Sequence, residues 1–180
     1  MKDHLHISFD LETLATTPDA HILSIGACSF DLTTGEIVHK FHKILSPQNQ
    51  KRFIDPETVM WWMGQSKAAR ESILQDTGNL LDTTLVYLSN WVRETHAKYV
   101  WGNGAIFDIS ILENAIRQVG GRVPWLFYNV RDMRTIVDLA QASKDFEKSK
   151  IPFEGTKHSA LSDAIHQAKI IMQACNILGV

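Results

Sequence analysis

The sequence predicts one α/β domain in which helices flank a mixed sheet. Three observations support this fold class. The chain has 180 residues, of which 44% are hydrophobic, so it has the size of one domain and enough apolar residues for a sizeable core. Up to residue 45 the apolar residues alternate or run together as in strands, whereas later ones mostly recur with helical spacing. Two short strand-like segments between the later helices indicate an α/β order, and we expect residues 1–180 to form a single domain.

Three predicted strands open the chain as a meander. In residues 4–12, apolar and polar residues alternate strictly, which is the two-residue period of a strand. An apolar run over 22–30 predicts the second strand, and turn-forming residues 33–36 lead into a third over 37–45. The apolar side of the first strand should be its buried face.

Helical patterns dominate the rest of the chain. Asp55 followed by Pro56 is a helix-start signal, a capping residue before a proline at the first helical position, and predicts a short helix through Trp62. The other segments either have apolar residues three and four apart or are short apolar runs between turn residues. They predict helices over 66–75, 80–96, 109–119, 133–140 and 161–178, and strands over 99–101 and 125–128.

The segment of residues 144–160 has no convincing period. It is rich in lysine and contains Pro152 and Gly155. A segment of about 17 residues without a regular element is more typical of a functional loop than of a chance connection. We therefore expect a functional loop directly before the last helix.

The charge balance excludes some functions. There are 18 Lys and Arg residues against 20 Asp and Glu, a formal net charge of −2, which excludes a wholly basic coat for DNA but allows a local basic groove. The two cysteines, Cys28 and Cys175, are isolated and belong to no zinc-type pair. The sequence shows no signal-peptide pattern, and no apolar run reaches the ~18 residues of a membrane span. We expect a cytoplasmic protein that does not enter membranes.

Four acidic residues and one histidine lie near the ends of predicted elements. Asp10 and Glu12 are two residues apart on the first strand, so their carboxylates project from the same face. Asp108 is in the first turn of a helix, Asp163 begins the last helix, and His158 lies in the loop before it. Each has an ordinary explanation as a solvated strand residue, a helix-start carboxylate or a surface histidine. Paired acids beside a core are nevertheless costly unless a cation or a proton neutralises them.

These residues belong to three motifs in chain order. The motifs are FDLET over residues 9–13, NGAIFD over 103–108 and HSALSD over 158–163. Together they resemble the motifs of the DEDDh group of 3′–5′ exonucleases, which have the ribonuclease-H-like fold. The segment TVMWW over 58–62 is similar to a small stand-alone branch of that group, which includes exonuclease-VIII-like and phage-type enzymes and exoribonucleases.

The resemblance implies a mixed five-stranded sheet flanked by helices, with the acids meeting at one end. It also implies that Asp10, Glu12, Asp108 and Asp163 hold two divalent metal ions and that His158 is the general base. Oxygen-only ligands suit Mg²⁺ or Mn²⁺ and disfavour zinc. Two ions ~4 Å apart can stabilise both the attacking and the leaving oxygen of a phosphoryl displacement. A histidine with an ordinary pKa of about 6.5 can take a proton at neutral pH.

An exonuclease also needs contacts to a strand end, usually cations on phosphates and aromatic rings against bases. The candidates for contact with the substrate are Thr13, Leu14, Asn103, Phe107, Trp61, Trp62 and Lys157. We expect one tryptophan of the 61–62 pair to be buried and the other to lie nearer the site. Basic residues gather in and before the loop, namely Arg131, Arg134, Lys144, Lys148, Lys150 and Lys157. Acids are interleaved with them, so a solvated surface is the alternative interpretation.

The leading prediction is a divalent-metal-dependent 3′–5′ exonuclease. It would hydrolyse phosphodiester bonds at the 3′ end of RNA or DNA, single-stranded or with a 3′ overhang, and release nucleoside 5′-monophosphates. Two alternatives stay open: a phosphodiesterase that finishes very short oligonucleotides, and a catalytically inactive nucleic-acid-binding module of the same fold. The inactive module would normally lack one of the five functional residues, and all five are present. The resemblance also allows a homodimer, although no apolar stripe in the sequence marks a dimer face.

Overall fold

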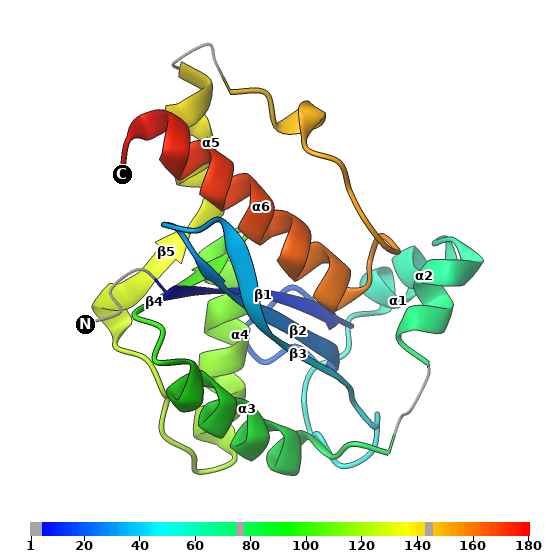
Figure 1. Cartoon of the computed structure of the whole chain (residues 1–180). Coiled ribbons are helices and arrows are strands. Elements are labelled where there is room, and N and C mark those ends of the chain that lie inside the picture. Colours follow the sequence, from blue (N-terminus) through cyan, green and yellow to red (C-terminus); the bar gives the residue numbers. More distant parts are fainter. Residues whose placement is uncertain (1–4, 75–77, 143–145) are drawn as a thin grey trace.

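The computed structural model describes residues 5–74, 78–142 and 146–180. Its centre is a five-stranded sheet with the order β3-β2-β1-β4-β5 (Figure 1). The strands are β1 (Leu5–Thr13), β2 (Ile22–Asp31), β3 (Glu36–Ile44), β4 (Tyr99–Gly102) and β5 (Val130–Asp132). The first three pair antiparallel as a meander, while β4 pairs parallel with both β1 and β5. The predicted mixed five-stranded sheet is therefore confirmed.

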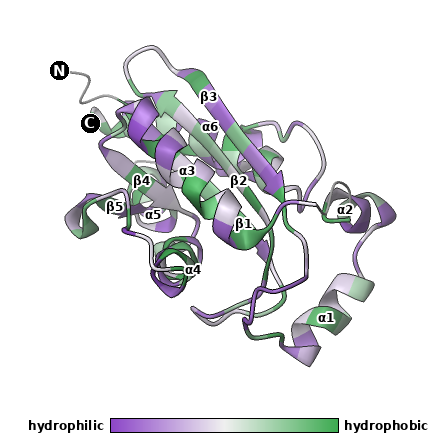
Figure 2. Ribbon diagram, turned by 90° about the horizontal axis from the view of Figure 1, so that it is seen from below, coloured by the Kyte–Doolittle hydropathy of each residue, from purple (hydrophilic) through white to green (hydrophobic). Residues whose placement is uncertain are grey.

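Helices cover both faces of this sheet. The helices are α1 (Pro56–Met63), α2 (Lys67–Ser72), α3 (Leu81–Thr95), α4 (Ala105–Gln118), α5 (Met133–Ala142) and α6 (Ala160–Leu178). α3 and α4 share one apolar core with the sheet, and α5 and α6 share a second core on its other face (Figure 1). α1 and α2 stand apart from the sheet (Figure 2) and form a third, smaller cluster around Trp62. No helix that the structure describes is long and apolar enough to cross a membrane.

The helix-start signals act as predicted. Asp55 is the N-cap of α1 and accepts a hydrogen bond from the backbone N of Glu57 at 3.1 Å, with Pro56 as the first helical residue. Ser66 caps α2 in the same way, since its Oγ accepts from the backbone N of Ala69 at 3.2 Å. These caps satisfy backbone donors that a helix leaves unpaired, so two short helices can form outside the main core.

The predicted strand over 125–128 is wrong. That segment runs into a 3₁₀ turn, η1 (Phe127–Asn129), whose aromatic side chains are exposed, and β5 follows at Val130–Asp132. β5 is a short edge strand that is defined by its parallel pairing with β4. Because its three side chains show no apolar alternation, the more apolar residues just before it carried the misleading signal.

Both faces of β1 are buried, whereas the alternation predicted one buried face. His6, Ser8 and Glu12 lie on the polar face, and all three are buried. Partners from other elements satisfy two of them: Ser8 Oγ donates to Gln167 Oε1 at 3.4 Å, and Trp101 Nε1 donates to His6 Nδ1 at 2.9 Å. α6 thus removes the polar face from water, which makes any charge on that face costly.

The loop before α6 is partly structured. Phe146 and Ile151 are buried in the core that α5 and α6 share, and Lys148–Lys150 form a 3₁₀ turn, η2. Residues 144 and 145 lie outside the described part of the chain. The prediction of a segment without regular structure is therefore corrected, because two apolar side chains tie this loop to the helices beside it.

Candidate active site

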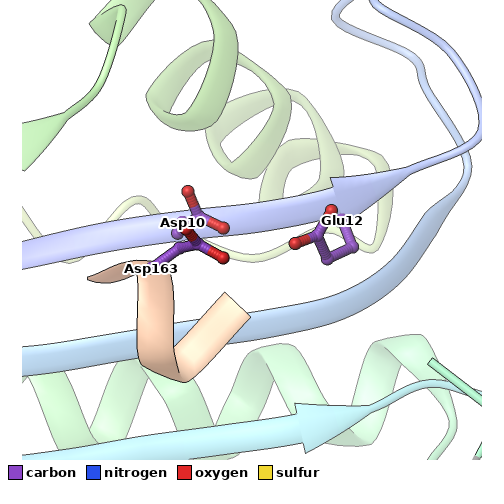
Figure 3. Close-up of side chains that lie close together, drawn as sticks. All are labelled: Asp10, Glu12 and Asp163. Atoms are coloured by element: carbon purple, nitrogen blue, oxygen red, sulfur yellow. The ribbon is translucent and has the colours of Figure 1, made fainter. Parts of the chain in front are cut away.

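Three carboxylates meet at one end of the sheet. Asp10 and Glu12 project from β1 and Asp163 from the first turn of α6, and one oxygen of each lies within 4.8 Å of the other two (Figure 3). The two-residue spacing along the strand places Asp10 and Glu12 on one face. That face is the one which α6 covers, so residues far apart in the sequence converge there.

A glycine opposite Asp10 brings α6 close to the sheet. Gly26 on β2 pairs with Asp10, and a Cβ atom built on Gly26 would lie 2.1 Å from the carbonyl carbon of Ala160. Because only glycine leaves this space empty, the first turn of α6 rests directly on β2. Asp163 follows within that turn, which sets its carboxylate beside that of Asp10.

Asp108 reaches β1 from α4. Its Oδ1 accepts a hydrogen bond from the backbone N of Leu11 at 3.1 Å, and the residue is 2% exposed. Asp132 Oδ2 accepts from the backbone N of Ala105 at 2.6 Å, which fixes the first turn of α4. The charge of Asp108 acts on Asp10, although Asp108 does not belong to the group of three oxygens within 4.8 Å.

Burial raises the pKa of all four carboxyl groups, and repulsion from neighbouring acids adds to the shifts of Asp10 and Glu12. Burial raises the pKa of Glu12 to about 8, and the charges of Asp163 and Asp108 add to the shift. Burial also raises the pKa of Asp108 to about 7. Hydrogen bonds to its carboxylate oppose this shift, and the one from the backbone N of Leu11 has the largest effect. Burial, followed by repulsion from the other three acids, raises the pKa of Asp10 well above its ordinary value. Burial raises the pKa of Asp163 as well, so the group needs protons or cations at neutral pH.

The donor set fits divalent cations. Asp163 Oδ2 is buried and has no hydrogen-bond partner among the residues that the structure describes. Asp10 Oδ1 accepts from Gln167 Nε2 at 2.6 Å, a contact that orients the carboxylate. Carboxylate oxygens at this spacing suit hard cations, which would also supply the positive charge that this group lacks. The acidic group is therefore a candidate metal site.

His158 borders the carboxylates but is held by α1 and α2. Its imidazole packs edge-on against Trp61, with ring centres 5.2 Å apart, and against Trp62 at 6.3 Å. Ser72 Oγ donates to the carbonyl oxygen of His158 at 2.8 Å. The backbone of His158 is left-handed, with a φ of 61°. The position of this histidine thus depends on elements outside the central sheet.

A cavity of about 570 Å³ opens on one side of Glu12, and we call it the first cavity. Thr13, Trp61, Trp62 and Phe107 contribute to its walls. Trp62 is 5% exposed and donates from Nε1 to the carbonyl oxygen of Thr13 at 2.9 Å, whereas Trp61 is 47% exposed. One tryptophan of the pair is therefore buried, as predicted, whereas the prediction that the other lies nearer the site stays a prediction, since both line this cavity and pack against His158.

Leu14 does not join its neighbours in this cavity. Its side chain packs on the small cluster of Trp62, Ala69 and Ile73, and it is absent from the walls of the two cavities that Glu12 lines. Leu14 therefore supports the wall that Trp62 forms rather than facing the open space.

A second cavity, of about 380 Å³, adjoins the first through Leu11 and Glu12, which line both. Asn103, Lys157 and His158 line it together with Asp10, Glu12 and Asp163. Asn103 Oδ1 accepts from Arg134 Nε at 3.4 Å, so an arginine that follows β5 orients the asparagine of the second motif.

The basic residues in and before the loop differ in their surroundings: some line the second cavity, and others contact an acid or an aromatic ring. Lys148 and Lys157 line the second cavity. Lys150 pairs with a neighbouring glutamate, and Arg131 lies over an aromatic ring of β4 with 4.3 Å between its guanidinium carbon and the ring centre. Lys144 lies outside the described residues. Two lysines thus line the same cavity as the acids, although the total charge is near zero.

Sequence reasoning missed Gln167, which contacts Asp10 directly. Gln167 is buried and lies four residues after Asp163 on α6, so the two side chains share one face of that helix. This spacing was an available signal. It also missed Ser72, whose contact with His158 spans 86 residues of sequence and leaves no local pattern.

The sheet order, together with acids contributed by β1, α4 and α6 at one end, is the arrangement that the resemblance to the DEDDh exonucleases implies. The chain belongs to the 3′–5′ exoribonuclease Rv2179c-like domain family, whose sequence model matches residues 5–175. It is also 24% identical to the exodeoxyribonuclease of Enterobacteria phage T4 over an alignment of 186 positions, and this alignment covers 87% of this chain and 81% of the phage protein.

Solved structures agree with this assignment at the level of the fold. Cell-death related nuclease 4 (CRN-4) has a TM-score of 0.70 at 14% identity, and the match covers 97% of this chain but 64% of that chain. The nuclease domain of 3′hExo, a DEDDh family member, has a TM-score of 0.62 at 13% identity over 96% of this chain and 92% of that chain. Exonuclease X has a TM-score of 0.59 at 16% identity over 97% and 93%. The predicted resemblance to the DEDDh exonucleases is confirmed.

Proposed function

We propose that this chain shortens single-stranded or 3′-overhanging RNA or DNA from the 3′ end, in a metal-dependent reaction that releases nucleoside 5′-monophosphates. The observation that carries the proposal is the group of Asp10, Glu12 and Asp163, whose oxygens lie within 4.8 Å of one another, beside the buried Asp108. Structures of similar fold hold rAMP in 3′hExo and 5′-overhanging duplex DNA in Exonuclease X. These ligands support a nucleic-acid substrate with either sugar.

Two ions of Mg²⁺ or Mn²⁺ are the proposed cofactor of each site. Asp10, Glu12, Asp108 and Asp163 would hold them through carboxylate oxygens. When bound, such ions activate a water molecule and stabilise the charge that develops on the phosphate. The raised pKa values support this role, because four carboxyl groups whose ionisation burial disfavours become favourable ligands once cations are present.

His158 is the proposed general base. It lines the second cavity beside Asp10 and Asp163, and a neutral imidazole can accept the proton that the attacking water loses. Its edge-on contact with Trp61 links the base to the wall of the first cavity. A substrate that fills this cavity would therefore touch the element that holds the base.

The first cavity is the proposed seat of the terminal nucleoside. Trp61 and Phe107 offer ring surfaces to a base, and Thr13 contributes to the wall next to Glu12. Trp62 and Leu14 support this wall from behind, through the bond from Trp62 to Thr13 and the cluster around Trp62. Asn103 and Lys157 contact the strand from the second cavity.

We further propose that residues 1–180 work as one domain in the cytoplasm. The two main apolar cores pack on opposite faces of one sheet, and both cysteines are free and buried, which is in keeping with a single unit and a reducing compartment. A homodimer is the proposed assembly, and light scattering at several protein concentrations tests it.

End-labelled RNA and DNA, single-stranded and with 3′ overhangs, test the proposed function. With Mg²⁺ or Mn²⁺ we expect stepwise shortening from the 3′ end, and with EDTA we expect none. Asp108→Asn and His158→Ala should each lower kcat by about 100-fold or more. The exposed Asp138 and His39 provide matched controls, because Asp138→Asn and His39→Ala should leave kcat unchanged. Activity that survives EDTA, or full activity of the Asp108 and His158 variants, would contradict the proposal.

A further inference from the structure

Two lysines of the loop before α6 take no part in its ion pairs. The described acids of this loop have other partners, which are Lys150 for Glu147 and Lys169 for Glu154, both at 2.8 Å. Within the described ranges of the chain, neither Lys148 nor Lys157 has a carboxylate at ion-pair distance. Both nevertheless line the second cavity, whose walls also include Asp10 and Asp163. Their charges are therefore available to an anion that enters this cavity.

The second cavity adjoins a third, of about 580 Å³. Lys148, Phe153, Lys157 and His166 line both of these spaces. The third cavity extends along the loop and is lined by none of the four acids, whereas the first cavity shares Leu11 and Glu12 with the second cavity and no lining residue with the third. Glu12 thus lies where the first cavity meets a longer groove made of the other two.

The position of the acids assigns a direction to a bound strand. A phosphodiester held at the carboxylates has the terminal nucleoside on one side and the rest of the strand on the other. Under the proposed function, the terminal nucleoside fills the first cavity beside Trp61 and Phe107. The upstream strand must then leave through the groove beside Lys148 and Lys157.

The chemistry of the groove suits a strand. Once two divalent cations balance the four carboxylates, Lys148 and Lys157 add two unbalanced positive charges, enough for two phosphates. Phe153 is half-buried, and its ring packs edge-on against His166 with ring centres 5.0 Å apart. A ring fixed in this way can present a surface for a base.

We propose that Lys148 and Lys157 bind the two phosphates 5′ to the scissile bond and that Phe153 contacts an upstream base. The enzyme therefore acts on strands of four or more nucleotides in preference to dinucleotides. This inference rests on the proposed function and deepens it by naming the length of strand that the site engages. It also argues against an enzyme specialised for the shortest oligonucleotides.

A dinucleotide and a tetranucleotide of the same sequence, both without a 5′-phosphate, test the inference. The dinucleotide has the scissile phosphate alone, whereas the tetranucleotide adds the two upstream phosphates. For the unmodified enzyme with Mg²⁺, we expect kcat/KM for the first cleavage to be at least about tenfold higher on the tetranucleotide. Lys148→Gln and Lys157→Gln should each lower this ratio about fivefold. On the tetranucleotide, log kcat/KM falls as log salt concentration rises, and each substitution should make this slope less negative by about 0.7.

Lys150→Gln is the matched control, because Lys150 lies in the same 3₁₀ turn as Lys148 but pairs with Glu147. Its ratio should equal that of the unmodified enzyme. The inference is overturned if the ratio of kcat/KM values is near one for the unmodified enzyme. It is also overturned if Lys148→Gln lowers kcat/KM equally on both substrates.

The p-nitrophenyl ester of thymidine 5′-monophosphate separates this failure from a failure of the proposed function. It offers a terminal nucleoside and a scissile phosphate without an upstream strand. If the ester is cleaved and the ratio of kcat/KM values is near one, the strand-binding role of the groove is wrong and the proposed function stands. If neither the ester nor the tetranucleotide is cleaved with Mg²⁺ or Mn²⁺, the proposed function and the inference both fall.

Discussion

Asp10 and Gly26 face each other across the β1–β2 pair, and the missing side chain of Gly26 is what allows α6 to lie beside Asp10. The backbone of Ala160 fills the space that a Cβ atom would need. The first turn of α6 therefore rests on the sheet at the level of Asp10, and Asp163 comes from that turn. A residue without any functional group thus determines the distance between two carboxylates of the site.

Gly26→Ala should separate these two carboxylates. The added methyl group would lie 2.1 Å from the Ala160 carbonyl carbon, so α6 has to shift away from the sheet and take Asp163 with it. We expect kcat to fall by about 100-fold and the melting temperature to fall by several degrees. Gly78→Ala is the control, because a Cβ atom at Gly78 would meet no heavy atom within 4 Å. A Gly26 variant with full activity would show that α6 does not set the site.

Gln167→Leu should weaken metal binding. The substitution removes the 2.6 Å hydrogen bond to Asp10 Oδ1 while it keeps most of the side-chain volume. Loss of a group that orients a metal ligand typically costs about tenfold or more in affinity, and we expect that loss in a calorimetric titration with Mn²⁺. Gln173→Leu, at an exposed position of the same helix, should bind Mn²⁺ as the unmodified protein does. Equal affinities for the two variants would exclude an orienting role for Gln167.

Ser72→Ala should impair the placement of His158. The hydroxyl of Ser72 donates to the carbonyl oxygen of His158, so its removal releases one of the contacts that hold the loop against α2. We expect kcat to fall by about threefold to tenfold with little change in KM, since a net hydrogen bond contributes about 1 kcal/mol. Ser72 Oγ also lies 2.7 Å from the carbonyl oxygen of Ala69 in its own helix, so Ser110→Ala is a suitable comparison, because the Ser110 hydroxyl bonds to the backbone of its own helix and to no other described segment. A change in KM alone would contradict this role.

The metal-free protein should lose stability as the pH rises from about 6.5 to 8.5. The pKa of Glu12 is raised to about 8 and that of Asp108 to about 7, whereas both groups ionise near pH 4 in the unfolded chain. In this window the folded state therefore binds more protons than the unfolded state, and unfolding becomes easier as pH increases. Burial lowers the pKa of His21 and His42, so above pH 7 these two histidines are largely neutral in both states.

Thermal unfolding in EDTA at three pH values measures this effect. We expect the melting temperature to decrease with pH in EDTA, and we expect added Mg²⁺ to raise it more at pH 8.5 than at pH 6.5. Glu12→Gln should flatten the dependence in EDTA, because its amide does not titrate. A melting temperature that increases with pH in EDTA would mean that the carboxylates are not held as close together as the structure has them.

Much of the fold and of the candidate site could be predicted because the signals are local. The two-residue period of β1 places Asp10 and Glu12 on one face, and the helical spacing before and after residues 99–101 locates Asp108 and its helix. The motif that contains Asp163 lies at the start of a strongly periodic helix. These features depend on neighbours within a few residues.

Other features could not be predicted because they depend on which elements pack together. The polar face of β1 is buried by α6, and its pattern alone is that of a solvated strand. β5 has no strand pattern of its own and is defined by its pairing with β4. Backbone hydrogen bonds between distant segments leave no trace in the local sequence.

The sequence by itself determined the kinds of residue at the candidate site, their order along the chain and the exonuclease family to which the chain belongs. Tertiary structure alone decided their geometry. The contact of Gln167 with Asp10 spans 157 residues, and that of Ser72 with His158 spans 86. Such contacts arise when α6 packs against the sheet and α2 against the loop, because burying apolar surface brings distant segments together whatever their separation in sequence.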